Sequence, residues 1–144
     1  VELMNWETLR TQEGLKATGQ NTDVDHLGIV FTEIGDDYLI AEMPVDHRSV
    51  QPMRMLHGGV SCVLIETLGS VAGMISLTNV GSDYVVGTEI NASHLRGVPE
   101  GGKVIGKVMP VRLGRRVQVW SVEISNEAGK LICVGRITCQ VISN

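Results

Sequence analysis

Glu66 is the only charged residue between Val60 and Leu77, a stretch of the sequence that is otherwise mostly apolar. A helix that is apolar on every side is usually buried in the core of a protein. A carboxylate in such a helix is costly to desolvate unless it is paired or takes part in a reaction. Glu66 is therefore the first candidate for chemistry, although local hydrogen bonds or a gap to solvent would also account for it.

Two glycines, Gly58 and Gly59, stand where this helix would begin. The first backbone N–H groups of a helix have no partner within the helix, and the helix dipole is positive at that end. Because glycine has no Cβ, an oxygen atom of a ligand could approach these N–H groups closely. The pair could thus form an oxyanion hole, or it could simply turn the chain into the helix and permit tight packing.

The spacing of Gly58 and Glu66 predicts a site shared by two subunits. Eight residues of helix separate them by about 12 Å, whereas two groups that act on one carbon atom must both lie close to it. Two copies of the helix, packed antiparallel about a twofold axis near Cys62, would bring Gly58 of one chain beside Glu66 of the other. Gly59 and Ser61 are small enough to permit that approach. The sequence therefore predicts a homodimer with two composite sites.

Two more polar side chains could assist at such a site. Ser70 follows Glu66 by four residues, so its hydroxyl would lie on the same helix face and could hold a water molecule or bond the carboxylate. A bond from Ser70 back to the Glu66 carbonyl is the structural alternative. His57, at the helix start, could polarise a substrate carbonyl or could only bond the backbone of the preceding loop.

Six strand-like segments flank this helix, two before it and four after it. Short turns of glycine and polar residues join most of them, which predicts antiparallel pairing. One curled sheet and one apolar helix can cover each other's apolar faces, so we expect a single α+β domain over residues 1–144 with the sheet wrapped around the helix. The predicted elements are a short N-terminal helix within Asn5–Thr18, strands at Ile29–Ile34 and Tyr38–Val45, a loop at Asp46–Leu56, the helix from His57 or Gly58 to Leu77, and strands at Tyr84–Arg96, Lys103–Val111, Val117–Ser125 and Leu131–Ile142.

The strand predicted at Tyr84–Arg96 is among the longest. Alternate residues of a regular strand point to the same face of the sheet. Simple alternation would place six side chains on one face, namely Val86, Thr88, Ile90, Ala92, His94 and Arg96.

The composition disfavours several classes of function. The 144 residues carry a net charge of −4, with 12 basic and 16 acidic residues, so nucleic-acid binding is not expected. The four histidines lack the spacing of metal ligands, and we expect neither a metal nor a cofactor. Polar residues interrupt the apolar helix, which argues against a membrane span. Three cysteines without a CxxC motif and an N-terminus unlike a signal peptide indicate a cytoplasmic protein.

Short motifs lie in order along almost the whole chain: His26–Ile29, Met43–Asp46, Gln51–Pro52, Leu56–Gly59, Glu66–Gly73, Val85–Ala92 and Leu113–Arg115. Together they resemble the hotdog-fold acyl-CoA thioesterases, and the 4-hydroxybenzoyl-CoA thioesterase branch in particular. The resemblance implies a six-stranded antiparallel sheet wrapped around one long central helix. It also implies hydrolysis of an acyl-CoA thioester with an aromatic acyl group, by a homodimer or by a tetramer of two dimers.

The same resemblance implies roles for individual residues. Glu66 would be the catalytic carboxylate, and the amide of Gly58 would polarise the thioester carbonyl. Gln51 and His57 would assist at that carbonyl or hold the site together, and Ser70 would help to place the attacking water. Gln51, His57 and Gly58 would come from one subunit and Glu66 and Ser70 from the other, which agrees with the spacing argument.

Coenzyme A, as part of the substrate, would bind at a further set of residues by the same resemblance. Arginines suit its phosphates, although each of them could equally be a solvated charge at a strand end. The implied contacts are Gly87, His94, Arg96, Arg112, Leu113, Gly114, Arg115, Arg116 and Val117.

Three residues at two sites depart from the family pattern and leave the acyl group unassigned. Met53-Arg54 stands where relatives have Phe-Gly, and Gly97 stands where they have Pro. Met53 would lie near the acyl group, where a flexible thioether admits other shapes than a ring does. The competing function is a non-catalytic acyl-CoA sensor. A dehydratase of the same fold would need a histidine-based site, and an inactive scaffold would not be expected to keep Glu66.

Overall fold

A computed structural model describes residues 6–79 and 81–143 of the chain. Its helical elements are a 3-10 helix η1 (Trp6–Arg10) and the α-helices α1 (Gln12–Thr18), α2 (Asp23–His26) and α3 (Gly58–Ile75). The strands are β1 (Val30–Ile34), β2 (Leu39–Pro44), β3 (Asp83–His94), β4 (Lys103–Leu113), β5 (Val117–Asn126) and β6 (Leu131–Ser143).

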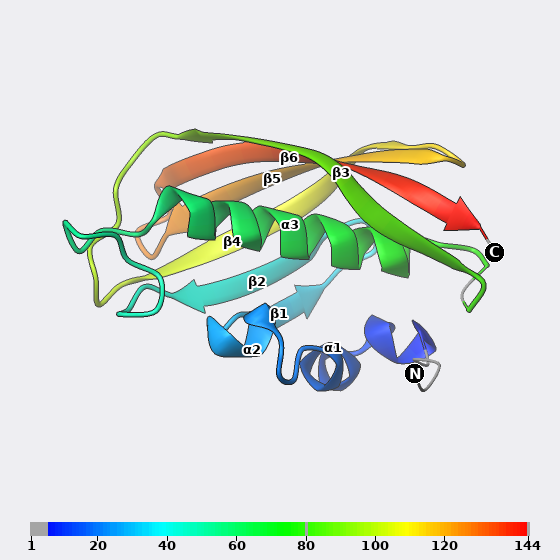
Figure 1. The fold of residues 1–144 in the computed structure, drawn as a ribbon, viewed down its shortest axis with the longest axis horizontal. Coiled ribbons are helices and arrows are strands. Elements are labelled where there is room, and N and C mark those ends of the chain that lie inside the picture. The colour runs from blue at the N-terminus through cyan, green and yellow to red at the C-terminus, as the bar shows by residue number, and fades with distance from the viewer. Residues whose placement is uncertain (1–5, 80, 144) are drawn as a thin grey trace.

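The six strands form one antiparallel sheet in the order β1-β2-β4-β5-β6-β3. The sheet curls around α3, which lies across its inner face (Figure 1). The two edge strands differ greatly, because β1 has 5 residues and lies beside α1 and α2, whereas β3 has 12 residues. The predicted α+β architecture, with one sheet wrapped around one long helix, is confirmed.

One side of α3 forms the centre of the core. Leu64, Ile65 and Leu68 are fully buried between the helix and the sheet. Each such side chain contributes about 1.5–3 kcal/mol to the free energy of unfolding. The helix lies very close to β6, since a Cβ on Gly135 would lie 2.6 Å from the Ile65 side chain and one on Gly69 would overlap Ile137. This packing fixes the position of α3, and with it the direction of the side chains on its opposite face.

The opposite face of α3 is open, contrary to the prediction of a helix buried on every side. Glu66 and Gly59 are exposed, and Cys62, Val63 and Thr67 are half-buried. The reason is that a single curled sheet covers only one side of the helix (Figure 1). By length and composition alone α3 could cross a membrane, but one side of it packs into the core of the domain.

The N-terminal region holds more helix than predicted. The residues around Asn5–Thr18 form two helical segments, η1 and α1, and Asn5 itself lies outside the described residues. The stretch 19–25, where no helix or strand is predicted, contains the start of α2. Thr22 caps α2 by accepting a hydrogen bond from the Val24 N–H, and Asp23 and Asp25 lie in the first turn, where the helix dipole favours acidic residues.

A β-bulge interrupts β3 and overturns the simple alternation predicted for that strand. Gly87 pairs with Cys139 and Glu89 with Thr138 of β6, so Thr88 is the extra residue. Before the bulge, Val85 and Gly87 face α3, whereas after it Ile90 faces the helix. A bulge shifts the period-two pattern by one residue, and composition gives no warning of it.

Candidate active site

The Glu66 carboxylate lies against Gly87 of β3. A Cβ placed on Gly87 would overlap Oε1 of Glu66, so only glycine leaves room for the carboxylate in this position. The bulge at Thr88 allows Gly87 before it and Ile90 after it to face α3 together. The backbone of β3 thus supports the carboxylate from one side while its other side stays open to solvent.

A cavity of about 320 Å³ surrounds Glu66. Its floor is the open face of α3, and β3 and α2 lie on opposite sides of that helix (Figure 1). No cationic side chain is among its lining residues, which are Asp23, Gly59, Cys62, Val63, Glu66, Thr67 and Ile90. A neutral or positively charged group fits this lining better than an anion does.

Within the described part of the chain, the start of α3 leaves one backbone donor of the predicted glycine pair free, the Gly58 N–H, because the Gly59 N–H is already bonded. His57 is the N-cap, and its Nδ1 accepts a hydrogen bond of 2.8 Å from the Gly59 N–H. Among the described residues no hydrogen-bond acceptor is recorded for the Gly58 N–H. His94 of β3 lies beside it, because a Cβ on Gly58 would be 2.9 Å from His94 Nε2. The Gly58 N–H is therefore free to donate a hydrogen bond to a ligand, whereas the Nδ1 atom of His57 caps the helix.

Gln51 lies in the loop that leads to α3. Its side-chain oxygen accepts a hydrogen bond from the Met53 N–H, which leaves its amide NH₂ group as the free end. Arg54 adopts a left-handed backbone with φ of 60°, the conformation that a glycine adopts without strain. An ion pair holds it there, with Arg54 Nε donating to Glu100 Oε2 at 2.8 Å. Met53, next to it, is 80% exposed.

One chain does not bring Gly58 and Glu66 together. Both lie on the uninterrupted helix α3, eight residues and therefore about 12 Å apart along its axis. They also line different cavities, since Gly58 belongs to one of about 370 Å³ shared with Ser61, His94 and Arg96. The geometric premise of the composite site is thus present in the folded chain.

The residues predicted to contact coenzyme A fall into two groups. His94 and Arg96 lie at the end of β3 near Gly58. Gly87 lies about 23 Å further back along the strand. The segment from Arg112 to Val117 spans the end of β4, the turn that follows it and the start of β5. It lies at the same end of the sheet as Gly87, because Gly87 and Gln118 both pair with Cys139 of β6. Within one chain the two groups do not meet.

Two further side chains near Glu66 are those of Ser70 and Cys139. Among the described residues, the Ser70 hydroxyl has no hydrogen bond to the Glu66 carboxylate or to the Glu66 carbonyl, so neither predicted partner is engaged. Cys139 lies beneath the site, where burial first and Glu66 second raise the pKa of its thiol to about 11. That thiol is therefore protonated at neutral pH and unsuited to act as a nucleophile.

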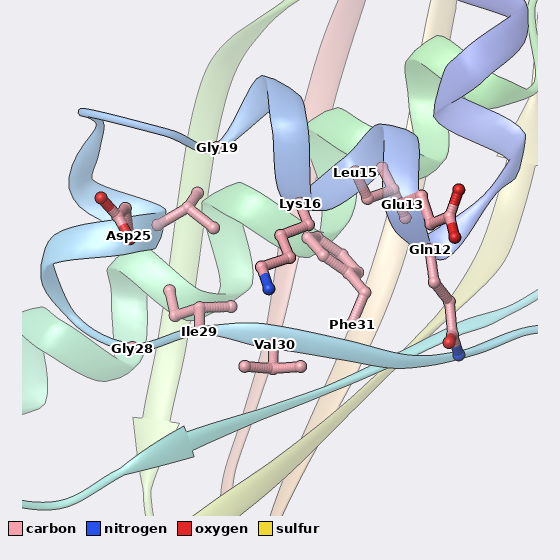
Figure 2. A pocket seen from close by; sticks show the side chains of 11 residues that line it. Gln12, Glu13, Leu15, Lys16, Gly19, Asp25, Gly28, Ile29, Val30 and Phe31 are labelled. Carbon is pink, nitrogen blue, oxygen red and sulfur yellow. The ribbon is translucent and has the colours of Figure 1, made fainter.

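Another cavity, of about 380 Å³, lies between α1 and β1 (Figure 2). Figure 2 shows Lys16 extending from α1 toward β1, close to Phe31. None of the predicted site residues lines it. Within residues 6–79 and 81–143 no group of three potential metal ligands occurs. Sequence reasoning missed Asp23 and Thr67 of the Glu66 cavity, although the Thr22-Asp23 capping signal could have located α2.

Comparison with known proteins agrees with this geometry. The sequence profile described as Thioesterase superfamily matches residues 53–133. The chain is 48% identical over 139 residues to the proofreading thioesterase EntH of Cronobacter sakazakii, covering 96% of this chain and 99% of that protein. The structure of thioesterase HI1161 from Haemophilus influenzae is similar with a TM-score of 0.88 and 48% identity, covering 92% and 91% of the two chains. The structure of a mutant of thioesterase PA1618 from Pseudomonas aeruginosa is similar with a TM-score of 0.90 and 40% identity, covering 93% of this chain and 95% of that one.

The chain therefore belongs to the thioesterase superfamily and has the hotdog fold of that family. It is a thioester hydrolase.

Proposed function

We propose that the protein is a cytoplasmic acyl-CoA thioesterase that acts on aromatic acyl groups, with Glu66 as the catalytic carboxylate and the Gly58 amide as the oxyanion donor. One observation carries this proposal. The exposed Glu66 carboxylate lies against Gly87, and the Gly58 N–H, for which the described residues provide no acceptor, lies about 12 Å away on the same helix. Each is half of a thioester-cleaving site, and neither can act alone. The resemblance to a proofreading thioesterase supports the thioester chemistry.

A dimer formed through β3 would complete the site. The outer edge of β3 has no partner strand among the described residues, and 12 residues of open edge are a strong template for pairing with another chain. Gly58 lies beside His94, and Glu66 lies against Gly87, so α3 and β3 run in opposite directions. A twofold axis that passes midway between these two contacts, near Asn91, would bring Gly58 of one subunit to Glu66 of its partner.

The same axis would unite the two groups of predicted coenzyme A contacts. It would carry His94 and Arg96 of one subunit to the end of the sheet where the partner holds Gly87 and its turn at 112–117. The arginines in these segments would then face one substrate, where guanidinium groups bind phosphates in bidentate fashion. The acyl group would extend into the cavity around Glu66, whose lining residues are acidic or uncharged.

In the proposed reaction, Glu66 takes a proton from water while the water oxygen attacks the thioester carbon. The carbonyl oxygen becomes an oxyanion that accepts a hydrogen bond from the Gly58 N–H. The C–S bond then breaks, and the leaving coenzyme A thiolate takes up the proton that Glu66 removed from the water, which restores the Glu66 carboxylate. Alternatively Glu66 attacks the thioester carbon directly and displaces the coenzyme A thiolate, which forms an anhydride. Water then hydrolyses the anhydride to the free acid and the Glu66 carboxylate.

An Ellman's-reagent assay across benzoyl-, dihydroxybenzoyl-, naphthoyl- and aliphatic-CoA tests the activity and the acyl preference. Glu66→Gln keeps the size of the side chain and removes the base, so we expect the rate to fall at least about a hundredfold. Ser82→Ala, at an exposed site on the loop before β3, is the control. Wild-type turnover by Glu66→Gln would refute the assignment of Glu66, and no turnover of any thioester by the wild type would favour the acyl-CoA sensor.

The two forms of the reaction differ in the fate of oxygen atoms. After multiple turnovers in oxygen-18 water, an anhydride that water opens at the Glu66 carbonyl leaves label in the Glu66 carboxylate, whereas the general-base route leaves none. Mass spectrometry of the peptide that contains Glu66 reads the difference directly.

A further inference from the structure

We propose that Asp23 selects the acyl group, by excluding acyl groups that carry a negative charge and favouring those that carry a hydrogen-bond donor. The inference rests on the proposed function, because it concerns the acyl part of the same substrate. Asp23 lies on α2 and lines the cavity of Glu66, although the two residues are 43 positions apart in the sequence. It also lies outside the segment that the superfamily profile matches, residues 53–133.

The charge of the cavity lining gives the first argument. The lining has two carboxylates, Asp23 and Glu66, and no lysine, arginine or histidine. An acyl group with its own carboxylate would bring a third negative charge into this space without a cation to pair with. Like charges at short range disfavour binding, most of all where water is partly excluded.

The side chain of Asp23 is free to contact a ligand. Among the described residues its carboxylate has no recorded hydrogen bond or ion pair, whereas the carboxylate of Asp25 on the same helix accepts from the Asn21 N–H at 3.3 Å. A carboxylate accepts hydrogen bonds only, and a bond to an ionised acceptor is stronger than one between neutral groups. A hydroxyl or amino substituent on the acyl group is therefore the complement of Asp23.

The position of Asp23 is fixed rather than incidental. Thr22 caps the N-terminus of α2, and at the other end Arg48 Nη1 donates a hydrogen bond of 2.7 Å to the His26 carbonyl. Arg48 in turn is paired with Asp46 at 2.6 Å. The helix is thus capped at its start by Thr22 and bonded at its end to Arg48, so Asp23 lies on one side of the cavity with a defined geometry.

A series of near-isosteric substrates tests the proposal: 4-methylbenzoyl-, 4-aminobenzoyl- and 4-carboxybenzoyl-CoA. For the wild type we expect kcat/KM to favour the amino over the methyl substrate, and to be about tenfold or more lower for the carboxy substrate. Asp23→Asn removes the charge and should raise the carboxy-to-methyl ratio about tenfold. Asp23→Leu removes the acceptor as well and should abolish the preference for the amino substrate.

Asp25→Asn is the matched control, because it makes the same change on the same helix but lines the cavity between α1 and β1. Its substrate ratios should equal those of the wild type. Ratios measured on one preparation do not depend on the fraction of active enzyme, so partial unfolding of a variant cannot imitate the effect.

The outcomes separate the two proposals. If the wild type hydrolyses 4-methylbenzoyl-CoA and both Asp23 variants keep its substrate ratios, the role of Asp23 is refuted while the proposed function stands. An equal change in Asp25→Asn would also refute it. If the wild type hydrolyses none of the three thioesters, the proposed function itself fails.

Discussion

The position of one carboxylate depends on the absence of one methyl group. Glu66 lies against Gly87, where any larger residue would overlap Oε1 of the carboxylate. The carboxylate is the far end of a flexible and exposed side chain, so it can move aside at little cost in stability. Activity and stability should therefore respond differently to a change at Gly87.

Gly87→Ala should lower kcat about tenfold to a hundredfold, because a displacement of about 1 Å is enough to misplace a catalytic group. The melting temperature should stay close to that of the wild type. Steady-state kinetics and a thermal melt measure the two quantities on the same sample. Gly102→Ala is the control, since its Cβ would make ordinary contacts at 3.4 Å or more and it lies outside the Glu66 cavity.

The split between kcat and KM also tests the role that the family resemblance implies for Gly87. A glycine that only makes room for coenzyme A would raise KM when replaced and leave kcat unchanged. A fall in kcat at constant KM indicates that Gly87 acts through Glu66. An unchanged kcat would contradict the positioning role.

At the scale of elements, the side chain of Arg48 links α2 to the loop that precedes the active site. Arg48 bonds both oxygens of Asp46 and also the His26 carbonyl at the end of α2. The hydrogen bonds from Arg48 lower the pKa of Asp46 from 3.8 to about 2. A carboxylate whose pKa is lower in the folded state stabilises the protein above its unfolded pKa, and loses this contribution as the pH falls through the folded pKa.

Asp46→Asn should therefore be less stable than the wild type at pH 6, by about 1 kcal/mol after allowance for solvent screening. The difference should shrink between about pH 4 and pH 2, because Asp46 takes up its proton near pH 4 in the unfolded chain and only near pH 2 in the folded one. Urea unfolding at a series of pH values measures it. Asp36→Asn, at an exposed carboxylate without an ion pair among the described residues, is the control. A difference that stays constant down to pH 2 would contradict the assignment.

At the scale of the whole molecule, a composite site predicts that two inactive variants restore each other. Gly58 is the first residue of α3, where proline is well tolerated, and the extended backbone of His57 suits a following proline. Gly58→Pro therefore removes the N–H while the helix remains. Gly58→Ala keeps the N–H and adds a Cβ near His94, so it controls for the crowding that proline also causes.

Glu66→Gln and Gly58→Pro should each be inactive alone, whereas co-expressed chains should recover roughly a quarter of wild-type activity. Half of the dimers would then be mixed, and each mixed dimer would hold one intact site. Size-exclusion chromatography with light scattering checks that dimers form. Activity no higher than that of the separate variants would contradict a shared site, and so would a monomer with full wild-type activity.

Local patterns were sufficient for most of the secondary structure. The helix around Glu66, the strands that flank it and the turns between them all follow from periodicity and turn residues, and their predicted ends differ from the observed ones by few residues. The N-terminal region was less predictable, because α2 has a single turn and depends on the Thr22 cap and on Arg48. Short helices rely on contacts with distant residues, which a local pattern does not contain.

The sequence alone determined that one carboxylate and one pair of glycines share a helix, and helix geometry then fixed the distance between them. Only the tertiary structure decided what surrounds them. The bulge at Thr88 allows Gly87 and Ile90 to face α3 together, and the position of α2 brings Asp23 into the cavity of Glu66. Both depend on packing between segments far apart in the chain, and such packing is set by the whole fold rather than by neighbouring residues.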